Sequence, residues 1–193
     1  MSTTQPIRSK QLLHDFKEYY LTKQPNSRNY TLILIGLNTA LRINDILHLT
    51  WGDVYCTEHS RFYTHLLITE KKTEKETRIL INRELQETLL SYRKTQTSIA
   101  DTDYLFPSPR KADSPLSRYQ AYRIVRKAAE AVGIEDVIRC HSLRKTFGYH
   151  AWKMGTPPAL LMEIYNHSSF QLTNHYLAIE QDDKDAVFRD IQL

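Results

Sequence analysis

The chain has 193 residues, enough for one sizeable hydrophobic core, and a modest formal net charge of +4. Its two cysteines, Cys56 and Cys140, have no paired spacing, which argues against a disulfide framework and against a zinc site. The sequence contains no secretory signal and no apolar run of membrane length, so we expect a soluble protein of the cytoplasm.

The first half of the chain shows helical apolar spacing and then a short region of β character. Aromatic and β-branched residues on both sides of a charged turn are typical of a β-hairpin. A turn with N-cap residues, Pro25-Asn26-Ser27, separates the first two helices. The expected elements are helices at 11–21 and 29–39, a short helix beginning near Arg42, hairpin strands at 62–69 and 77–82, and a helix at 84–94.

The second half of the chain is predicted to be helical after one long loop. The loop covers 101–114 and contains the apolar Tyr104-Leu105-Phe106, which we expect to anchor it. Helices are expected at 117–132, at 141–154 and after Pro157-Pro158, where proline suits the first turn. Together the elements predict a mainly α-helical α+β fold with a small antiparallel β-hairpin insert.

Chemically active residue types gather near the C-terminus. His141 and Arg144 are three residues apart, so a helix would place both side chains on one face, and His167 and Tyr176 follow. A guanidinium stays charged and binds two phosphate oxygens at once. A phenol is a weak nucleophile when neutral, but neighbouring cations favour its phenolate. The set therefore suits attack by Tyr176 on a phosphodiester that cations hold, without a metal ion.

In this order the residues resemble the tyrosine recombinase family, which is also called the phage integrase family. The first box of the family, an arginine that opens a helix with an acid three residues later, resembles Ala40-Leu41-Arg42-Ile43-Asn44-Asp45-Ile46-Leu47. The later elements match as follows: His-x-x-Arg at His141 to Arg144, the next histidine element at Tyr165-Asn166-His167, and the nucleophile at Tyr176. The resemblance runs over most of the chain.

In this family a lysine on a β-hairpin between the two boxes acts as general acid to the 5′-oxygen leaving group. Lys72 is the best match, because a Lys-Thr pair before the β-like run at 77–81 resembles the hairpin of the family. Lys71 and Lys75 stand in the same charged turn and remain alternatives.

Two positions depart from the pattern of the family. Asn166 stands where the family most often has glycine, but asparagine tolerates the left-handed conformation better than most residues, so a tight turn remains possible. Lys145 replaces a frequent histidine after Arg144. Neither change removes a chemical group of the expected reaction.

Each of these residues also has a structural interpretation when it is taken alone. Arg42 would pair with Asp45 on a helix surface, the lysines would form a solvated turn, and the histidines and Tyr176 would pack in the interior. Five elements in the order and spacing of the family favour the functional interpretation.

Basic residues outnumber acidic ones across 71–145, which suits contact with a phosphate backbone. In the helix at 117–132, Ser117 and Gln120 form a capping-box pattern, and Val125, Ala129 and Val132 lie on the face expected to meet the core. An ordinary amphipathic surface helix is the alternative interpretation. The residues expected to contact DNA are Arg118, Arg123, Arg126 and Lys127.

The resemblance implies a site-specific DNA recombinase that cleaves and rejoins DNA through a 3′-phosphotyrosine, with no metal, no ATP and no other cofactor. The implied roles are phosphate binding by Arg42, His141, Arg144 and His167, attack by Tyr176, and protonation of the 5′-hydroxyl by Lys72. The expected partners are double-stranded DNA, further protomers on paired sites and accessory DNA-bending proteins. An inactive DNA-binding relative and an enzyme that relaxes DNA like a type IB topoisomerase are the alternatives.

Few residues precede Arg42, so we expect a single catalytic domain over residues 1–193 without a separate N-terminal core-binding domain. A naturally minimal recombinase, similar to the short invertases that switch bacterial fimbrial genes, and an excised catalytic domain both fit the sequence. The tail at 177–193 combines an acidic run with a small apolar face of Val187, Phe188 and Ile191. We expect this tail to dock on a neighbouring protomer, as it often does in the family, with packing on its own domain as the alternative.

Overall fold

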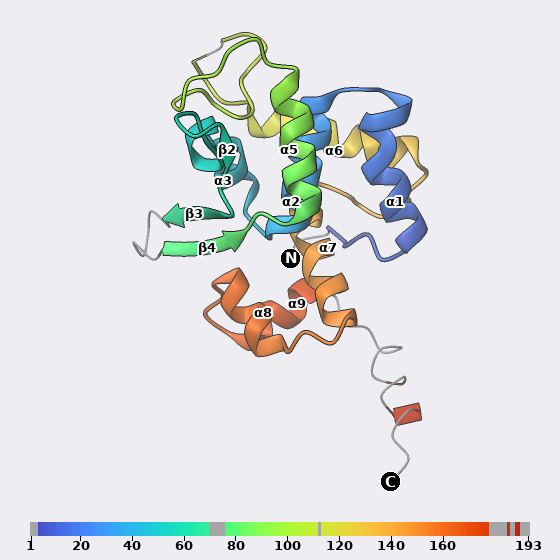
Figure 1. Ribbon diagram of the computed structural model, residues 1–193. Helices are drawn as coiled ribbons and strands as arrows, with labels where there is room; N and C mark the ends of the chain where they lie inside the picture. The colour runs from blue at the N-terminus through green and yellow to red at the C-terminus, as the bar shows by residue number, and fades with distance from the viewer. Residues whose placement is uncertain (1–3, 70–75, 112, 178–184, 186–187, 190–193) are drawn as a thin grey trace.

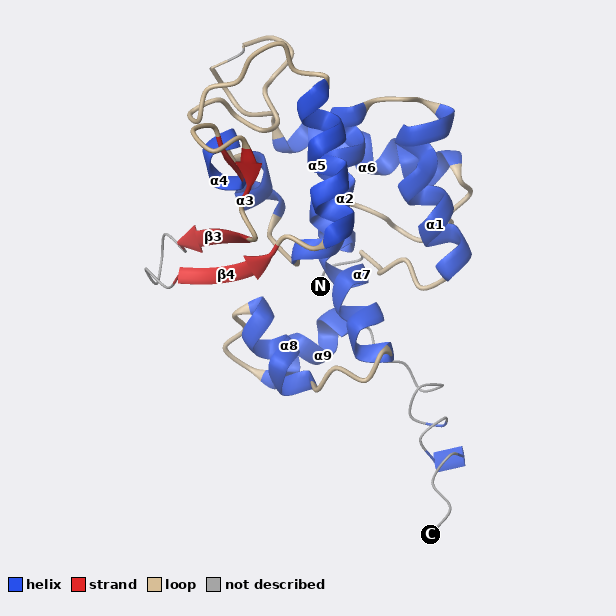
Figure 2. Ribbon diagram, viewed as in Figure 1, coloured by secondary structure: helices blue, strands red, loops and turns tan. Residues whose placement is uncertain are grey.

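The computed structural model describes residues 4–69, 76–111, 113–177, 185, 188 and 189. Helices make up most of this part of the chain, and two small antiparallel β-hairpins stand beside them (Figures 1 and 2). The predicted α+β class with a dominant helical content is therefore confirmed. Among the described helices, none combines the length and the apolar character that crossing a bilayer requires.

The N-terminal helices form around one central buried helix. The first predicted helix consists of α1 (Lys10–Glu18) and a π-helical turn, η1 (Tyr19–Lys23). Helix α2 (Ser27–Thr39) is capped by Asn26, whose side chain accepts a hydrogen bond from the Asn29 backbone N–H, as the predicted N-cap turn requires. Most of α2 is buried, since α5 and α7 both pack against it (Figure 1).

The end of α2 positions the first arginine of the motif. Ala40, the C-cap, is left-handed with φ 56°, and the chain then turns so that Arg42 is the N-cap of α3 (Ile43–Leu47). The short helix predicted near Arg42 is thus confirmed. A further short helix, α4 (Trp51–Val54), follows it.

The β region contains one hairpin more than the sequence pattern indicated. Strands β3 (His65–Thr69) and β4 (Glu76–Leu80) pair antiparallel from His65 opposite Leu80 to Thr69 opposite Glu76. The expected first strand at 62–69 was too long at its start, because Phe62 belongs to β2 (Arg61–Phe62). Strand β2 pairs with β1 (Tyr55–Cys56), and the rings of Tyr55 and Phe62 lie 4.9 Å apart between centroids.

The main core joins α2 to three later helices. Helix α5 (Arg83–Lys94) leads into the long loop, where Leu105 and Phe106 are fully buried, which confirms the predicted anchor. Helix α6 (Arg118–Ala131) begins with the predicted capping box, formed by Ser117 and Gln120. Helix α7 (Cys140–Lys153) closes this core.

A second, smaller core holds the C-terminal helices against α7. Helix α8 (Pro158–Tyr165) begins with proline in its first turn, as predicted, and α9 (Phe170–Leu177) follows after a tight turn. Ala40, Leu161, Tyr165 and Leu177 form the buried centre of this cluster. Figure 1 shows α8 and α9 on the side of α7 that faces the β3–β4 hairpin rather than inside the main core.

Candidate active site

A hollow of about 610 Å³ lies between the β3–β4 hairpin, α3 and α8. Its wall includes Arg42 and Asp45 from the first box, Arg144 from the second, and Tyr165 and Asn166 from the third element. Segments that are distant in the sequence therefore meet at one surface. For the motif residues to act on one phosphate, these segments have to lie close together in the fold, as they do here.

Arg144 is held rigidly at the base of this hollow. Only 4% of its surface is exposed, and its two terminal nitrogens donate hydrogen bonds to the carbonyl oxygens of Ala40 and Tyr165, the second at 2.6 Å. Its Nε atom is buried and has no hydrogen-bond partner among the described residues. Burial, followed by the neighbouring Arg42, lowers the pKa of Arg144. The guanidinium is thus a pre-oriented cation in a partly desolvated place, which suits an anionic ligand.

Tyr176 lies against the imidazoles and the guanidinium. Helix α9 places its ring centroid 4.9 Å from that of His141 and 4.4 Å from that of His167. The Cζ atom of Arg144 is 5.8 Å from the same ring centroid. The structure therefore brings together four of the predicted site residues, and Arg42 lines the adjoining hollow.

His167 is in an environment that disfavours its charged form. Burial comes first among the causes, followed by the positive neighbours Arg144, Arg42 and His141, and together they lower the pKa of His167 to about 4. The imidazole is therefore neutral at neutral pH. Its Nδ1 atom lies 3.1 Å from the hydroxyl oxygen of Thr173, which is fully buried.

The turn before His167 has the conformation that the sequence allowed. Asn166 is the C-cap of α8 and is left-handed, with φ 50° and ψ 49°. The departure from glycine at this position is thus compatible with a tight turn, as expected. The turn directs His167 towards Tyr176 instead of continuing α8.

Tyr165 supports the site in a way that the motif does not reveal. Its carbonyl oxygen accepts from Arg144, and its hydroxyl donates to the Arg144 carbonyl oxygen at 2.8 Å. Its ring stacks on His167, with centroids 4.9 Å apart. Burial raises the pKa of the Tyr165 hydroxyl well above its usual range, so this group remains a donor. The sequence placed Tyr165 beside His167 but gave no sign of these contacts.

Lys72 and its alternatives, Lys71 and Lys75, lie outside the described residues. Strands β3 and β4, which precede and follow these lysines in the sequence, contribute Leu67, Thr69 and other residues to the wall of the hollow.

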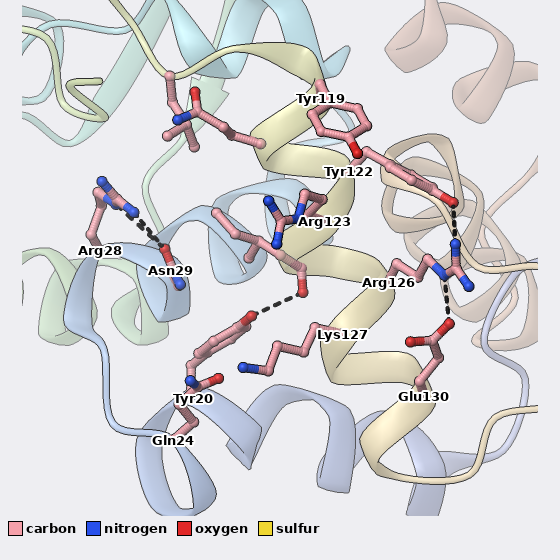
Figure 3. Close-up of a pocket in the computed structure, with 13 residues that line it drawn as sticks. Tyr20, Gln24, Arg28, Asn29, Tyr119, Tyr122, Arg123, Arg126, Lys127 and Glu130 are labelled. Atoms are coloured by element: carbon pink, nitrogen blue, oxygen red, sulfur yellow. Dashed lines mark hydrogen bonds and ion pairs between the residues drawn. The ribbon is translucent and has the colours of Figure 1, made fainter. Parts of the chain in front are cut away.

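Of the four predicted DNA-contact residues on α6, Arg123, Arg126 and Lys127 line one hollow, and Arg118 is not part of its lining. Arg118 donates to the Asn44 side chain through Nε at 3.2 Å and Nη2 at 3.0 Å, so it lies beside the first box. Arg126 is paired with Glu130 and donates to the Tyr122 hydroxyl at 3.2 Å. Figure 3 shows this hollow, which has a volume of about 530 Å³ and is lined by Arg28, Arg123, Arg126, Lys127 and nine other residues.

Cys140 is not a nucleophile candidate in this structure. Its side chain packs against the main core, and burial raises the pKa of its thiol to about 11. Within the described residues, no group of three or more histidine, cysteine, aspartate or glutamate side chains is placed to hold a metal ion.

Comparison with known proteins identifies the family. The model described as "Phage integrase family" matches residues 5–182. A Bacillus subtilis (strain 168) protein, "Probable integrase/recombinase YoeC", is 42% identical over 189 residues, which are 98% of this chain and 97% of that protein. The Escherichia coli (strain K12) "Type 1 fimbriae regulatory protein FimE" is 31% identical over 152 residues, 79% of this chain and 75% of FimE. The chain therefore belongs to the phage integrase family, the tyrosine recombinases of site-specific DNA recombination.

The fold agrees with this assignment. The crystal structure of XerA recombinase matches with a TM-score of 0.78 at 20% sequence identity and covers 98% of this chain. The chain spans 65% of the length of that structure. The shared fold is that of a tyrosine recombinase catalytic domain.

Proposed function

We propose that this chain cleaves and rejoins duplex DNA through a covalent 3′-phosphotyrosine on Tyr176. The observation that carries the proposal is the position of the Tyr176 ring, which contacts two imidazoles and lies near the buried guanidinium of Arg144. A phenol surrounded by phosphate-binding groups is placed for nucleophilic attack on a phosphodiester. Family membership supports the same chemistry.

Arg42, His141, Arg144 and His167 bind the scissile phosphate in this proposal. The two arginines supply permanent positive charge where the non-bridging oxygens gain charge in the transition state. His167 is neutral and therefore carries a single N–H. In this proposal its Nδ1 atom accepts from the Thr173 hydroxyl, so the N–H is on Nε2, which donates to the phosphate. Two carbonyl acceptors already orient Arg144, so little reorganisation accompanies the reaction.

The covalent step balances without an outside energy source. The Tyr176 phenol loses its proton to solvent and its oxygen forms a bond to phosphorus. The bond from phosphorus to the 5′-oxygen breaks, and the leaving 5′-oxygen takes a proton from the Lys72 ammonium, which solvent then protonates again. The phosphotyrosine keeps the energy of the diester, so a 5′-hydroxyl of a second duplex restores the DNA backbone in the reverse step. The proposal needs no metal ion, ATP or other cofactor.

The substrate of this proposal is double-stranded DNA in the cytoplasm. Arg118 lies beside the first box, and Arg123 and Lys127 form a basic surface further along α6, so both contribute to backbone contact. Arg126 contributes less, because Glu130 offsets its charge. Recombination needs further protomers on paired sites, and the exposed Leu160, Leu172 and Phe188 near the C-terminus offer apolar surface for such contacts. Accessory DNA-bending proteins belong to the same proposed assembly.

The test is a cleavage assay on nicked duplex DNA that carries the natural site of the protein. Tyr176→Phe removes only the attacking oxygen, so covalent protein–DNA adducts should vanish while DNA affinity stays nearly constant. Tyr149→Phe, which removes the hydroxyl of a tyrosine on α7 whose ring contacts His150 and Trp152, is the matched control and should form adducts normally. Adducts in Tyr176→Phe would move the nucleophile to another residue.

Two further measurements distinguish the proposed recombinase from other kinds of DNA-binding protein and DNA-cleaving enzyme. Cleavage should persist in EDTA, and Arg144→Ala should slow it by roughly a hundredfold or more, the scale of removing one transition-state donor. An inactive DNA-binding relative would form no adducts, and an enzyme like a type IB topoisomerase would relax supercoils without site preference.

Lys72 has its own test, because a general acid matters only when the leaving group is strongly basic. A substrate with a 5′-bridging sulfur, which leaves as a thiolate, should restore cleavage by Lys72→Ala but not by Arg144→Ala. If this substrate instead restores cleavage by Lys71→Ala or by Lys75→Ala, that lysine is the general acid.

A further inference from the structure

The segment before α1 is bound to α7, the helix that carries the second box. The Ile7 N–H donates to the Thr146 hydroxyl of α7 at 2.9 Å, and the Gln5 N–H donates at 3.2 Å to the carbonyl of Val137, which precedes α7. The Ile7 carbonyl oxygen lies 2.9 Å from Nε2 of His150. This short segment therefore follows α7 over more than one turn.

Lys145 makes the remaining contact of this segment and is itself buried. Only 2% of the surface of Lys145 is exposed. Its ammonium donates a hydrogen bond to the Thr4 carbonyl oxygen at 2.7 Å. No carboxylate of the described residues forms an ion pair with it. A buried charge without a counter-ion is costly, so a position that retains one needs a physical reason.

The ring of Tyr176, which lies near the Lys145 ammonium, offers such a reason. The Nζ atom of Lys145 is 6.0 Å from the ring centroid of Tyr176, and Cζ of Arg144 is 5.8 Å from that centroid. Two consecutive cations of α7 thus act on the ring of the nucleophile. A cation near an aromatic ring is attractive, and the attraction grows when the ring oxygen becomes negative.

We propose that Lys145 is a positioning residue for the nucleophile: its buried ammonium, fixed by the Thr4 carbonyl, orients Tyr176 and stabilises the negative charge of its oxygen during attack. Lys145 transfers no proton and does not touch the phosphate. The Thr4 carbonyl takes one hydrogen of the ammonium and so fixes the place of the charge. The segment before α1 thereby becomes a part of the active site.

Other titratable or charged groups around Tyr176 remain when Lys145 is changed. The groups that face the ring are Arg144 and His141 from α7, Tyr165 at the end of α8 and His167 in the turn that follows. Burial lowers the pKa of Lys145, so this ammonium loses its proton earlier than an exposed lysine would as the pH rises. The effect of the charge is therefore largest at neutral pH.

Three substitutions separate the charge of Lys145 from its hydrogen bond. Lys145→Arg keeps the charge and a donor, Lys145→Gln keeps a donor for Thr4 without charge, and Lys145→Met keeps neither. The measurement is single-turnover formation of the Tyr176 adduct on nicked DNA, from pH 6 to pH 10. Urea unfolding and DNA affinity are measured in parallel.

We expect Lys145→Met and Lys145→Gln to form the adduct about tenfold more slowly at neutral pH, and the difference should shrink as the pH rises and the Lys145 ammonium of the unchanged protein loses its proton. Lys145→Arg should keep most of the rate. DNA affinity should change less than about twofold because the group is buried, and the urea midpoint of Lys145→Met should equal or exceed that of the unchanged protein, since an uncompensated buried charge is removed.

The inference rests on the proposed function, and the outcomes keep the two apart. If Tyr176→Phe still forms adducts, the proposed function fails, and the inference fails with it. If adducts require Tyr176 but Lys145→Gln keeps the full rate and pH profile, only the inference is overturned. If a 5′-bridging sulfur restores Lys145→Met, the residue acts on the leaving group, and its role as a positioning residue for Tyr176 is wrong.

Discussion

Burial decides the charge states of the residues around Tyr176. His167 is neutral because its surroundings exclude water and add positive charge, whereas the guanidinium of Arg144 is held by two carbonyl oxygens. Tyr165 connects the two, because it stacks on His167 and exchanges hydrogen bonds with Arg144. The site is therefore a network in which each residue fixes the charge or the orientation of another.

Acidification should destabilise the protein through His167. In the folded state its pKa is about 4, against 6.5 for an unperturbed histidine, so the unfolded chain binds more protons between these values. The stabilisation is complete above pH 6.5 and is lost as the pH falls towards 4. We expect a loss of about 1–2 kcal/mol from this residue, after allowing for solvent screening of a half-buried group.

Urea unfolding at a series of pH values measures this loss. His167→Asn should have a flatter pH dependence between pH 6.5 and 4 than the unchanged protein. His59→Asn, a change at an exposed histidine, should leave the dependence as it is. The same slope in His167→Asn and in the unchanged protein would contradict the assignment.

At the scale of elements, the site depends on close contact between α7 and α8. Gly148 faces Tyr165, and a Cβ atom at this position would overlap the Tyr165 hydroxyl and lie 2.8 Å from Cζ. Glycine on α7 is therefore what allows Tyr165 to reach the Arg144 carbonyl. Asn166 then ends α8 and redirects the chain towards α9.

Gly148→Ala should disrupt this contact. We expect a loss of about 1–3 kcal/mol in the free energy of unfolding, as for other overpacked positions, together with slower adduct formation because Tyr165 no longer supports Arg144. In combination with Tyr165→Phe, which removes the overlapping hydroxyl, the added cost of Gly148→Ala should fall. Strictly additive losses in the two single variants and the double variant would rule out this steric explanation.

At the scale of the whole molecule, Tyr176, the proposed nucleophile, packs against the smaller of two cores. The main core joins α2, α5, α6 and α7, whereas α9 packs in the cluster around Ala40, Leu161 and Leu177 (Figure 1). The position of Tyr176 therefore depends on the few buried side chains of this smaller core. Contacts from a second protomer near this end of the chain would act directly on α9.

The C-terminal tail provides a test of that dependence. Phe188 is 80% exposed, and Ile191 lies outside the described residues. We expect Phe188→Ala combined with Ile191→Ala to reduce assembly on paired sites and recombination by about tenfold, while binding to a single site changes little. Electrophoretic mobility of complexes on one and on two sites measures the difference.

A matched control is Leu21→Ala, which removes an exposed apolar side chain from η1. This variant should assemble and recombine like the unchanged protein. Normal recombination by the double tail variant would show that the tail packs on its own domain instead.

Local sequence patterns predicted seven of the described helices in their order, but not the short helix α4 or helix α9, which carries Tyr176. Capping at Asn26 and Ser117, the proline at the start of α8 and the left-handed turn at Asn166 are short-range properties, so they could be read before any fold was known. The β1–β2 hairpin and the π-helical turn were missed, because their residues have no periodic pattern and owe their conformation to packing partners.

The sequence by itself determined which chemical groups this protein has, in the order of a tyrosine recombinase. Only the tertiary structure decided how those groups act. The partners of Arg144 are backbone carbonyls of Ala40 and Tyr165, the neutrality of His167 comes from burial, and Lys145 reaches both Thr4 and Tyr176. The physical reason is that hydrogen-bond distances and desolvation between residues far apart in the chain depend on how whole elements pack, which periodicity and spacing do not specify.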